Sequence, residues 1–150
     1  MKILDIHDLI IKEICTVVHY RGTSNKWFTK SRNFHVFAYC MEGYNNMQFK
    51  KGALNFGKNQ TIFVPKNSPH LNIPKGNYEV IAVHFRTKQS GSFEPLAFPE
   101  DKERALLPLF KEINRYYFKK EAGYYQRSLQ LLYAIIATLM EQNSFSTGNS

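Results

Sequence analysis

The sequence predicts a mainly β protein, in which a small antiparallel β-sandwich or barrel is followed by two C-terminal α-helices. Short runs of β-branched and aromatic residues, separated by Gly, Asn and Pro, recur up to about Arg86. From about Glu100 onward, apolar residues recur instead at helical spacing. Aromatic residues make up 15% of the 150 residues, which favours strands and an aromatic-lined interior. A chain of this length is large enough for one domain with a substantial core.

The strands are expected at residues 16–20, 32–41, 47–49, 54–56, 61–64 and 78–85. Turns rich in Gly, Asn or Pro separate them, notably at residues 42–46, 50–52 and 74–77. Both faces of the 32–41 and 78–85 strands are largely apolar, so these strands should be covered on both sides, as in a barrel with helices packed outside it. One face of each strand also carries a histidine, His35 or His84. Apolar walls with a few polar groups are typical of a barrel interior that holds a small ligand.

Two helices are expected in the last third of the chain. The first contains Leu109, Phe110, Ile113, Tyr116 and Tyr117 at helical spacing. Pro108 is tolerated only near the first turn of that helix, and Ala122-Gly123 should end it. The second helix should run from about residue 125 to 142, with a wide apolar stripe at Leu129, Leu132, Ile135, Ile136, Leu139 and Met140. A helix this apolar must be buried on more than one side, and packing on the sheet by one face and on a second subunit by the other is one way to achieve this.

Charge and cysteine content exclude several classes of function. Lys and Arg total 20 against 12 Asp and Glu, but the basic residues are scattered and form no recognition helix. We therefore expect a generally basic surface and no specific DNA binding by this segment. Cys15 and Cys40 match no zinc or redox motif and are expected to be buried thiols. No apolar run is long enough to span a membrane and the N-terminus has no signal-peptide features, so a cytoplasmic protein is expected.

Three segments and the two helices together resemble a known family. The segments are RNFHVFAYCMEG at 32–43, NQTIFVPKNSPH at 59–70 and YEVIAVHFR at 78–86. In this order they resemble the N-terminal cupin domain of AraC-type transcriptional regulators, over roughly residues 16 to 143. Where such domains usually have glycines in two turns, this chain has Asn59 and Asn67. Asn is the non-Gly residue that best tolerates φ > 0, so both positions are predicted to adopt that conformation.

The resemblance implies a small cupin, or jelly-roll-like, β-barrel at residues 1–99 and a helical dimerisation region at 100–143, with a linker or tail at 144–150. It further implies a barrel that senses a small-molecule effector, often a sugar or related metabolite, and helices that form a homodimer. DNA would be bound only through a C-terminal helix-turn-helix domain that is not present in this chain. On this reading the protein is not an enzyme and needs no cofactor. The rival hypothesis is a stand-alone, metal-dependent cupin enzyme, such as an isomerase or dioxygenase.

Candidate effector contacts follow from the strand pattern and the resemblance. Arg32 precedes the long strand, where the arabinose-responsive member of the family has a sugar-binding arginine; the alternative is a surface arginine. His70 follows the turn at the barrel edge and is either a ligand contact or a histidine with a structural hydrogen bond. The full set of candidates is Trp27, Arg32, His35, Phe37, Tyr39, His70, Asn72 and His84.

No catalytic or metal site is expected. Metal-binding cupins supply a His-x-His pair and a Glu, whereas residues 23–30 contain no His or Glu. Serine nucleophile elbows, phosphate-binding Gly loops and paired catalytic carboxylates do not occur in the sequence. The predicted dimer interface is the set Leu129, Leu132, Tyr133, Ile136 and Leu139, with packing on the barrel as the alternative role of the same stripe.

Overall fold

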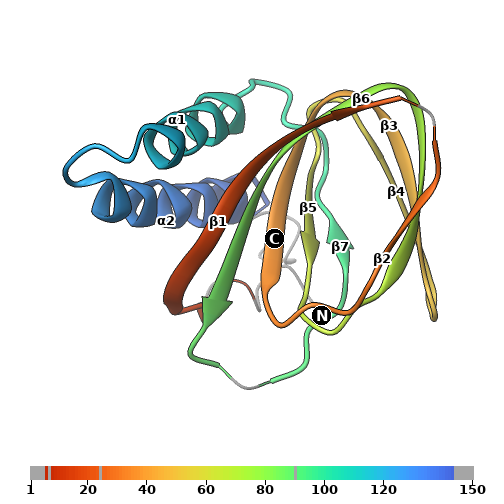
Figure 1. The fold of residues 1–150 in the computed structure, drawn as a ribbon, viewed down its shortest axis with the longest axis horizontal. Coiled ribbons are helices and arrows are strands. Elements are labelled where there is room, and N and C mark those ends of the chain that lie inside the picture. The colour runs from red at the N-terminus through yellow and green to blue at the C-terminus, as the bar shows by residue number, and fades with distance from the viewer. Residues whose placement is uncertain (1–5, 7, 24, 90, 144–150) are drawn as a thin grey trace, which may run out of the picture.

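A computed structural model describes residue 6 and residues 8–23, 25–89 and 91–143 of the chain. The predicted tail at 144–150 lies outside the described residues. The elements follow one another as β1 (Ile11–Gly22), β2 (Trp27–Thr29), β3 (His35–Phe49), β4 (Gly52–Gly57), β5 (Thr61–Val64), β6 (His70–Thr87), β7 (Leu96–Ala97), α1 (Leu106–Lys119) and α2 (Tyr124–Gln142). The predicted fold class is confirmed: the chain is mainly antiparallel β, with two C-terminal helices that lie side by side on one face of the curved sheet (Figure 1).

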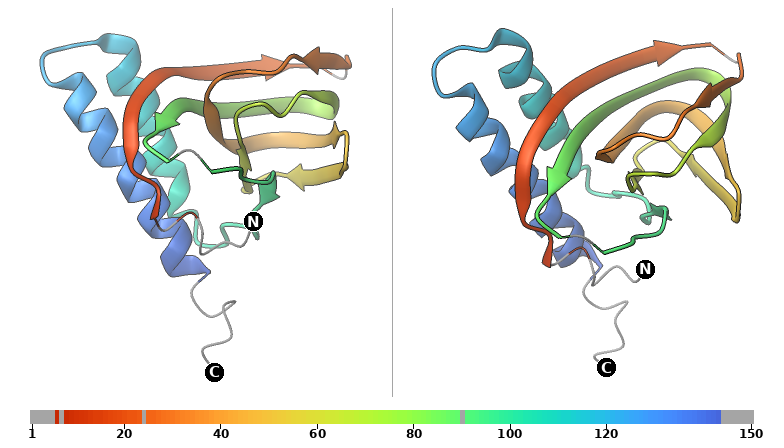
Figure 2. Two further views of the ribbon diagram at one scale, coloured as in Figure 1. Left: turned by 90° about the horizontal axis from the view of Figure 1, so that it is seen from below. Right: turned by 60° about the horizontal axis from the view of Figure 1, so that its bottom comes forward.

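Two long strands, β3 and β6, form the centre of the sheet. The first half of β3 pairs with the second half of β6, and the second half of β3 pairs with the first half of β6. The two pairings are the centres of two sheets that are continuous through β3 and β6. Strands β1, β5 and β7 extend the sheet around the first pairing, while β2 and β4 extend the other. The two sheets curve round a common interior in the manner of a jelly roll (Figure 2).

The turns predicted at residues 42–46 and 74–77 are wrong, because both segments lie inside continuous strands. Gly43 and Gly76 do adopt φ of 80° and 73°, but they bend β3 and β6 without ending them. The pairing register shifts at Glu42 and Tyr44, which is the mark of a β-bulge. A Cβ atom on Gly43 would lie 2.8 Å from Cα of Tyr78, so only glycine fits between the strands here.

Two other backbone predictions are confirmed. Asn59 and Asn67 have φ of 67° and 60°, in the left-handed region predicted for them. Each lies in a turn next to β5, where the resemblance had placed a glycine. Both helices also lie close to their predicted positions, with Pro108 in the first turn of α1 and Gly123, at φ 83°, before α2.

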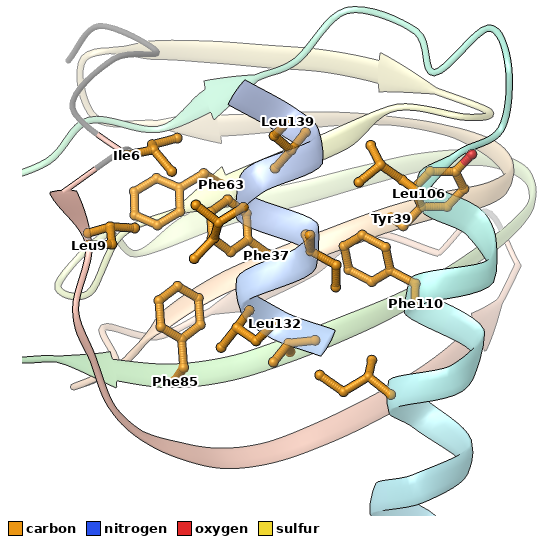
Figure 3. Close-up of a cluster of buried hydrophobic side chains, with 14 of the residues drawn as sticks. Ile6, Leu9, Phe37, Tyr39, Phe63, Phe85, Leu106, Phe110, Leu132 and Leu139 are labelled. Carbon is orange, nitrogen blue, oxygen red and sulfur yellow. The ribbon is translucent and has the colours of Figure 1, made fainter. Parts of the chain in front are cut away.

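The core consists of two hydrophobic clusters on opposite faces of the central strands. The interior cluster lies between the two sheets and contains Val36, Ala38, Cys40, Met47, Phe56, Ile62, Val64, Tyr78, Val80 and Ala82. The helix-side cluster packs the other face of the sheet against the helices, as Figure 3 shows for Phe37, Phe85, Phe110 and Leu132. Because successive side chains in a strand point to opposite faces, the two clusters alternate along β3 and β6.

The predicted dimer stripe needs correction. Leu132, Ile136 and Leu139 are buried in the helix-side cluster, so they pack within the chain and offer no surface to a second copy. Leu129 is half-buried against the same cluster, and only Tyr133, at 43% exposure, faces outward. The hydroxyl of Tyr133 accepts the backbone N–H of Ile11 at 2.8 Å, which ties α2 to the start of β1. No described helix is both long and apolar enough to cross a membrane.

Candidate ligand-binding site

Three of the predicted contact residues lie near one another at one end of the space between the sheets. His70 and His84 lie on either side of the Gly76 bend in β6, so the bend brings the two ends of this strand to the same end of the interior. Arg32 precedes β3 and lies close enough to both imidazoles to act on their charge. We call Arg32, His70 and His84 the mouth cluster.

Aromatic rings surround the mouth cluster. The His84 ring stacks on Phe34 at a centroid distance of 4.5 Å, and the Arg32 guanidinium lies 5.2 Å from the centroid of the same Phe34 ring. The His70 ring lies 5.0 Å from Phe49. A cation over an aromatic face is held by the ring quadrupole while its N–H donors stay available at the ring edge.

Two turns hold the mouth cluster in place. The backbone N–H of Asn67 donates to the carbonyl of Arg32 at 2.8 Å, so the left-handed Asn67 positions the start of β3. Nδ1 of His70 lies 2.9 Å from the carbonyl of Ser68, which only an N–H can satisfy. The neutral imidazole of His70 therefore donates through Nδ1 and keeps the lone pair on Nε2 as an acceptor.

Burial keeps both histidines of the mouth cluster uncharged. Burial, with the nearby Arg32 charge adding to it, lowers the pKa of His84 to about 4. The pKa of His70 is also lowered, by burial first and then by Arg32, although its hydrogen bond to Ser68 acts in the opposite direction. At neutral pH the cluster thus combines one guanidinium with two neutral imidazoles. This arrangement offers both donors and an acceptor to a polar ligand.

A second polar group lies deeper in the interior. Asn72, which is 2% exposed, donates to Oγ1 of Thr29 at 2.9 Å and to the carbonyl of Trp27 at 3.3 Å. Its Oδ1 accepts from Asn45 at 3.2 Å, and Asn45 also donates to the Tyr78 hydroxyl at 3.3 Å. Asn72 has therefore used its donors and its acceptor within the protein, and its role here is to join β2, β3 and β6.

The predicted contact Trp27 lies half-buried at the edge of the interior cluster. Its ring lies 5.1 Å from Tyr20 and 6.2 Å from Tyr78. The three rings come from β1, β2 and β6 and form an aromatic wall next to the Asn72 network. Such a wall is suited to the apolar face of a ligand.

His35, Phe37 and Tyr39 do not line this interior, and their placement corrects the expected site. They alternate with Val36 and Ala38 and therefore point toward the helices. The His35 ring packs near Phe63, Phe85 and Phe93, and its Nδ1 accepts the N–H of Lys66 at 3.0 Å. A ligand held between the sheets does not reach these three side chains.

The sequence pattern missed four residues of this site. Phe34 and Phe49 border the mouth cluster, and Asn45 and Tyr78 form the polar network. Asn45 was hidden because it lies in a Gly- and Asn-rich segment that resembles a turn. The two-residue period that it shares with Met47 and Phe49 is the signal that places it on the interior face. In the described ranges, no three His, Cys, Asp or Glu side chains gather as metal ligands.

Comparisons with known proteins were made by sequence and by fold. No protein-family model matches the chain. No curated protein sequence matches it either. Among solved structures, the chain is similar to the EutQ protein of Clostridium difficile, at 14% identity and a TM-score of 0.43 over 49% of this chain and 57% of that one. A cupin-2 domain containing protein from Shewanella frigidimarina is similar at 13% identity and a TM-score of 0.42, over 47% of this chain and 69% of that one.

Bacillus subtilis oxalate decarboxylase, in a structure concerned with its Mn(II) centres, is similar at 17% identity and a TM-score of 0.42, over 55% of this chain and 24% of that one. The expectation that the chain is not an enzyme is therefore corrected, because proteins of similar fold include this enzyme. The chain spans less than two thirds of the length of EutQ and of oxalate decarboxylase. A likeness of this extent assigns no reaction, metal or partner to the chain.

Proposed function

We propose that this chain is the effector-binding domain of an AraC-type transcriptional regulator, and that its effector is a small hydroxyl-rich metabolite such as a sugar. The observation that carries the proposal is the proximity of Arg32, His70 and His84 at one end of the barrel. The guanidinium supplies several donors in one plane, and the neutral His84 imidazole supplies one donor and one acceptor. His70 supplies only the acceptor Nε2, because its Nδ1–H already donates to the Ser68 carbonyl. Hydroxyl groups need both kinds of partner.

The surroundings of the mouth cluster favour the same class of ligand. Phe34 and Phe49 lie beside it, and Trp27 lies half-buried further in. Sugars present apolar C–H faces as well as hydroxyl groups, so rings next to donors and acceptors complement them. Among the residues that the structure describes, no carboxylate forms an ion pair with Arg32, His70 or His84. A ligand therefore meets donors that are not already paired with an acid.

The proposed mechanism is linkage between the ligand and the presentation of DNA-binding domains. A ligand that contacts both ends of β6 favours one curvature of that strand, and β6 also pairs with β1, on which both helices pack. In a homodimer with helix-turn-helix domains attached, such a bias would change how these domains meet DNA in the cytoplasm. Of the predicted interface residues, Tyr133 is the one that is exposed and could contact the second subunit of such a dimer.

A thermal-shift screen of the purified chain against sugars and related metabolites tests the proposal, followed by calorimetry on any hit. A ligand at 100 times its Kd stabilises the folded state by about 2.7 kcal/mol. Arg32→Gln and His84→Gln should each weaken binding at least tenfold. The exposed Arg127→Gln in α2 removes the same charge elsewhere and should leave binding unchanged. Equal binding by the wild type, the mouth variants and Arg127→Gln would contradict the proposal.

Two further measurements separate this proposal from the metal-dependent enzyme. Metal analysis of the purified chain should find no stoichiometric metal. A stoichiometric metal that is present in the wild type and lost in His70→Ala would favour the enzyme. The coding region downstream of Ser150 should encode a helix-turn-helix domain. A coding region without one would overturn the regulator proposal.

A further inference from the structure

A separate cleft of about 500 Å³ lies between α1 and the helix-facing side of the sheet. Its lining includes Ile81 and Met41, which belong to the helix-side cluster and point away from the mouth cluster. The volume is within the range of about 300–1,000 Å³ that is usual for small-molecule sites. The cleft is therefore large enough for a ligand and distinct from the space between the sheets.

One face of α1 forms a wall of this cleft. Leu107, Lys111 and Asn114 lie on it at a spacing of four and then three residues, which places them on the same side of the helix. Arg104 lies just before the helix, in the left-handed region at φ 55°. Two cations and one amide thus face a floor that is partly apolar.

The charges in the cleft do not balance. Glu79 is paired with Arg21 at 2.9 Å and with His19 at 2.6 Å, and Glu42 is paired with Lys58 at 2.9 Å. Both acidic side chains are therefore engaged.

Arg104 and Lys111 remain without a carboxylate. Neither side chain takes part in the ion pairs formed within the described part of the chain. The buried acid Asp101 directs its two oxygens to other donors: the Tyr39 hydroxyl, the N–H groups of Ala105 and Leu106, and the Gln142 amide. The cleft thus holds two positive charges that form no ion pair with a carboxylate on its wall.

We propose that this cleft binds a small metabolite that carries a phosphate monoester. Such a group has a charge of about −1.5 to −2 at pH 7 and several strong acceptor oxygens, so it matches two unpaired cations. Arg104 binds it as a planar donor fork, Lys111 as a point charge, and Asn114 through its amide. The remaining part of the metabolite lies against Met41, Leu107 and Ile81. A monocarboxylate would leave one of the two cations unpaired.

Calorimetry at constant ionic strength tests this site. The probes are glucose 6-phosphate, glycerol 3-phosphate, adenosine monophosphate, inorganic phosphate and glucose. At least one monoester should bind with saturation, more tightly than inorganic phosphate, and glucose should not compete with it. The double variant Arg104→Gln/Lys111→Gln should weaken that binding at least tenfold. The matched double variant Arg115→Gln/Lys119→Gln, on the same helix but outside the cleft, should change it by less than twofold.

The outcomes that overturn the proposal are distinct. They are the lack of binding by every monoester, equal affinity for inorganic phosphate and the esters, and unchanged binding in the cleft double variant. Both replaced side chains are exposed, so circular dichroism and the Tm should match the wild type. Arg32→Gln should leave monoester binding intact, which separates this site from the mouth cluster and lets either proposal fail without the other.

Discussion

The hydroxyl group of Tyr39 donates a hydrogen bond to Oδ2 of Asp101 across 3.3 Å. Asp101 is 1% exposed, and its carboxylate also accepts the N–H groups of Ala105 and Leu106 and the Gln142 amide, at 3.0, 2.9 and 2.8 Å. One side chain thus joins β3, the first turn of α1 and the end of α2. A carboxylate at a helix N-terminus satisfies backbone donors that have no partner within the helix. Asp101 therefore attaches the helices to the barrel.

Replacing this carboxylate should weaken the attachment. In Asp101→Asn, an NH₂ group replaces one carboxylate oxygen. This NH₂ group is a donor and faces the N–H donors that the oxygen accepts in the wild type. We expect a loss of about 1–3 kcal/mol in the free energy of unfolding, the usual cost of unpaired buried donors. Urea unfolding followed by circular dichroism measures it. The neighbouring exposed Glu100→Gln is the matched control and should stay within about 0.5 kcal/mol of wild type. An equal effect of both changes would contradict the role of Asp101.

Stability should fall as the pH drops below about 6.5. Burial, followed by the charge of Lys66 for His35 and of Arg32 for His84, lowers the pKa of each histidine to about 4. In the unfolded chain a histidine has a pKa of about 6.5. Between these values the unfolded state binds more protons, so stability is fully present above pH 6.5 and decreases toward pH 4, by at most about 1.4 kcal/mol per pH unit for each histidine.

Urea unfolding at a series of pH values measures this slope. The double variant His35→Gln/His84→Gln should flatten the profile between pH 6.5 and pH 4, whatever its stability at pH 8. An unchanged slope in the double variant would mean that other groups cause the acid sensitivity.

Changes in the α2 stripe should affect folding before association. Leu132 is completely buried on the inner face of α2, so Leu132→Ala should lower the free energy of unfolding by about 2–5 kcal/mol. Leu132→Asp should give unfolded or aggregated protein. The exposed Gln130→Ala on the same helix is the control and should stay within about 0.5 kcal/mol of wild type. Light scattering combined with urea unfolding distinguishes the outcomes. A folded, stable monomer from Leu132→Asp would show that this residue lies in an interface after all.

The turn at Asn67 should prefer glycine to alanine. With φ at 60°, Asn67→Ala places a Cβ in the left-handed region and should cost about 1–2 kcal/mol. Asn67→Gly meets no such penalty and should be clearly more stable than Asn67→Ala in the same urea experiment. Because the Asn67 N–H holds the carbonyl of Arg32, the alanine variant should also weaken effector binding. Equal stability of the two variants would be inconsistent with the left-handed turn.

Local patterns predicted some features well for a physical reason. Asn59 and Asn67 were predicted to adopt φ > 0 because few residues other than glycine and asparagine tolerate it, and this tolerance belongs to the residue itself. The helix positions follow from a 3.6-residue period and from Gly123, which are also local. The turns at Gly43 and Gly76 were mispredicted because glycine with positive φ produces a turn or a bulge. Whether a turn or a bulge results depends on whether the partner strand continues past the glycine.

Alternation along β3 and β6 divided their residues correctly into two faces, and the amino-acid sequence by itself determined that both faces are buried. Each face carries apolar residues and a histidine, so the composition of the face with Phe37 and Tyr39 did not indicate which face lies inside the barrel. The tertiary structure decided it: the helices cover the face of His35, and the second sheet covers the face of His84. Likewise, the bend at Gly76 brings His70 and His84 to one end of the interior. Contacts between residues distant in sequence depend on the whole path of the chain, and no local period records that path.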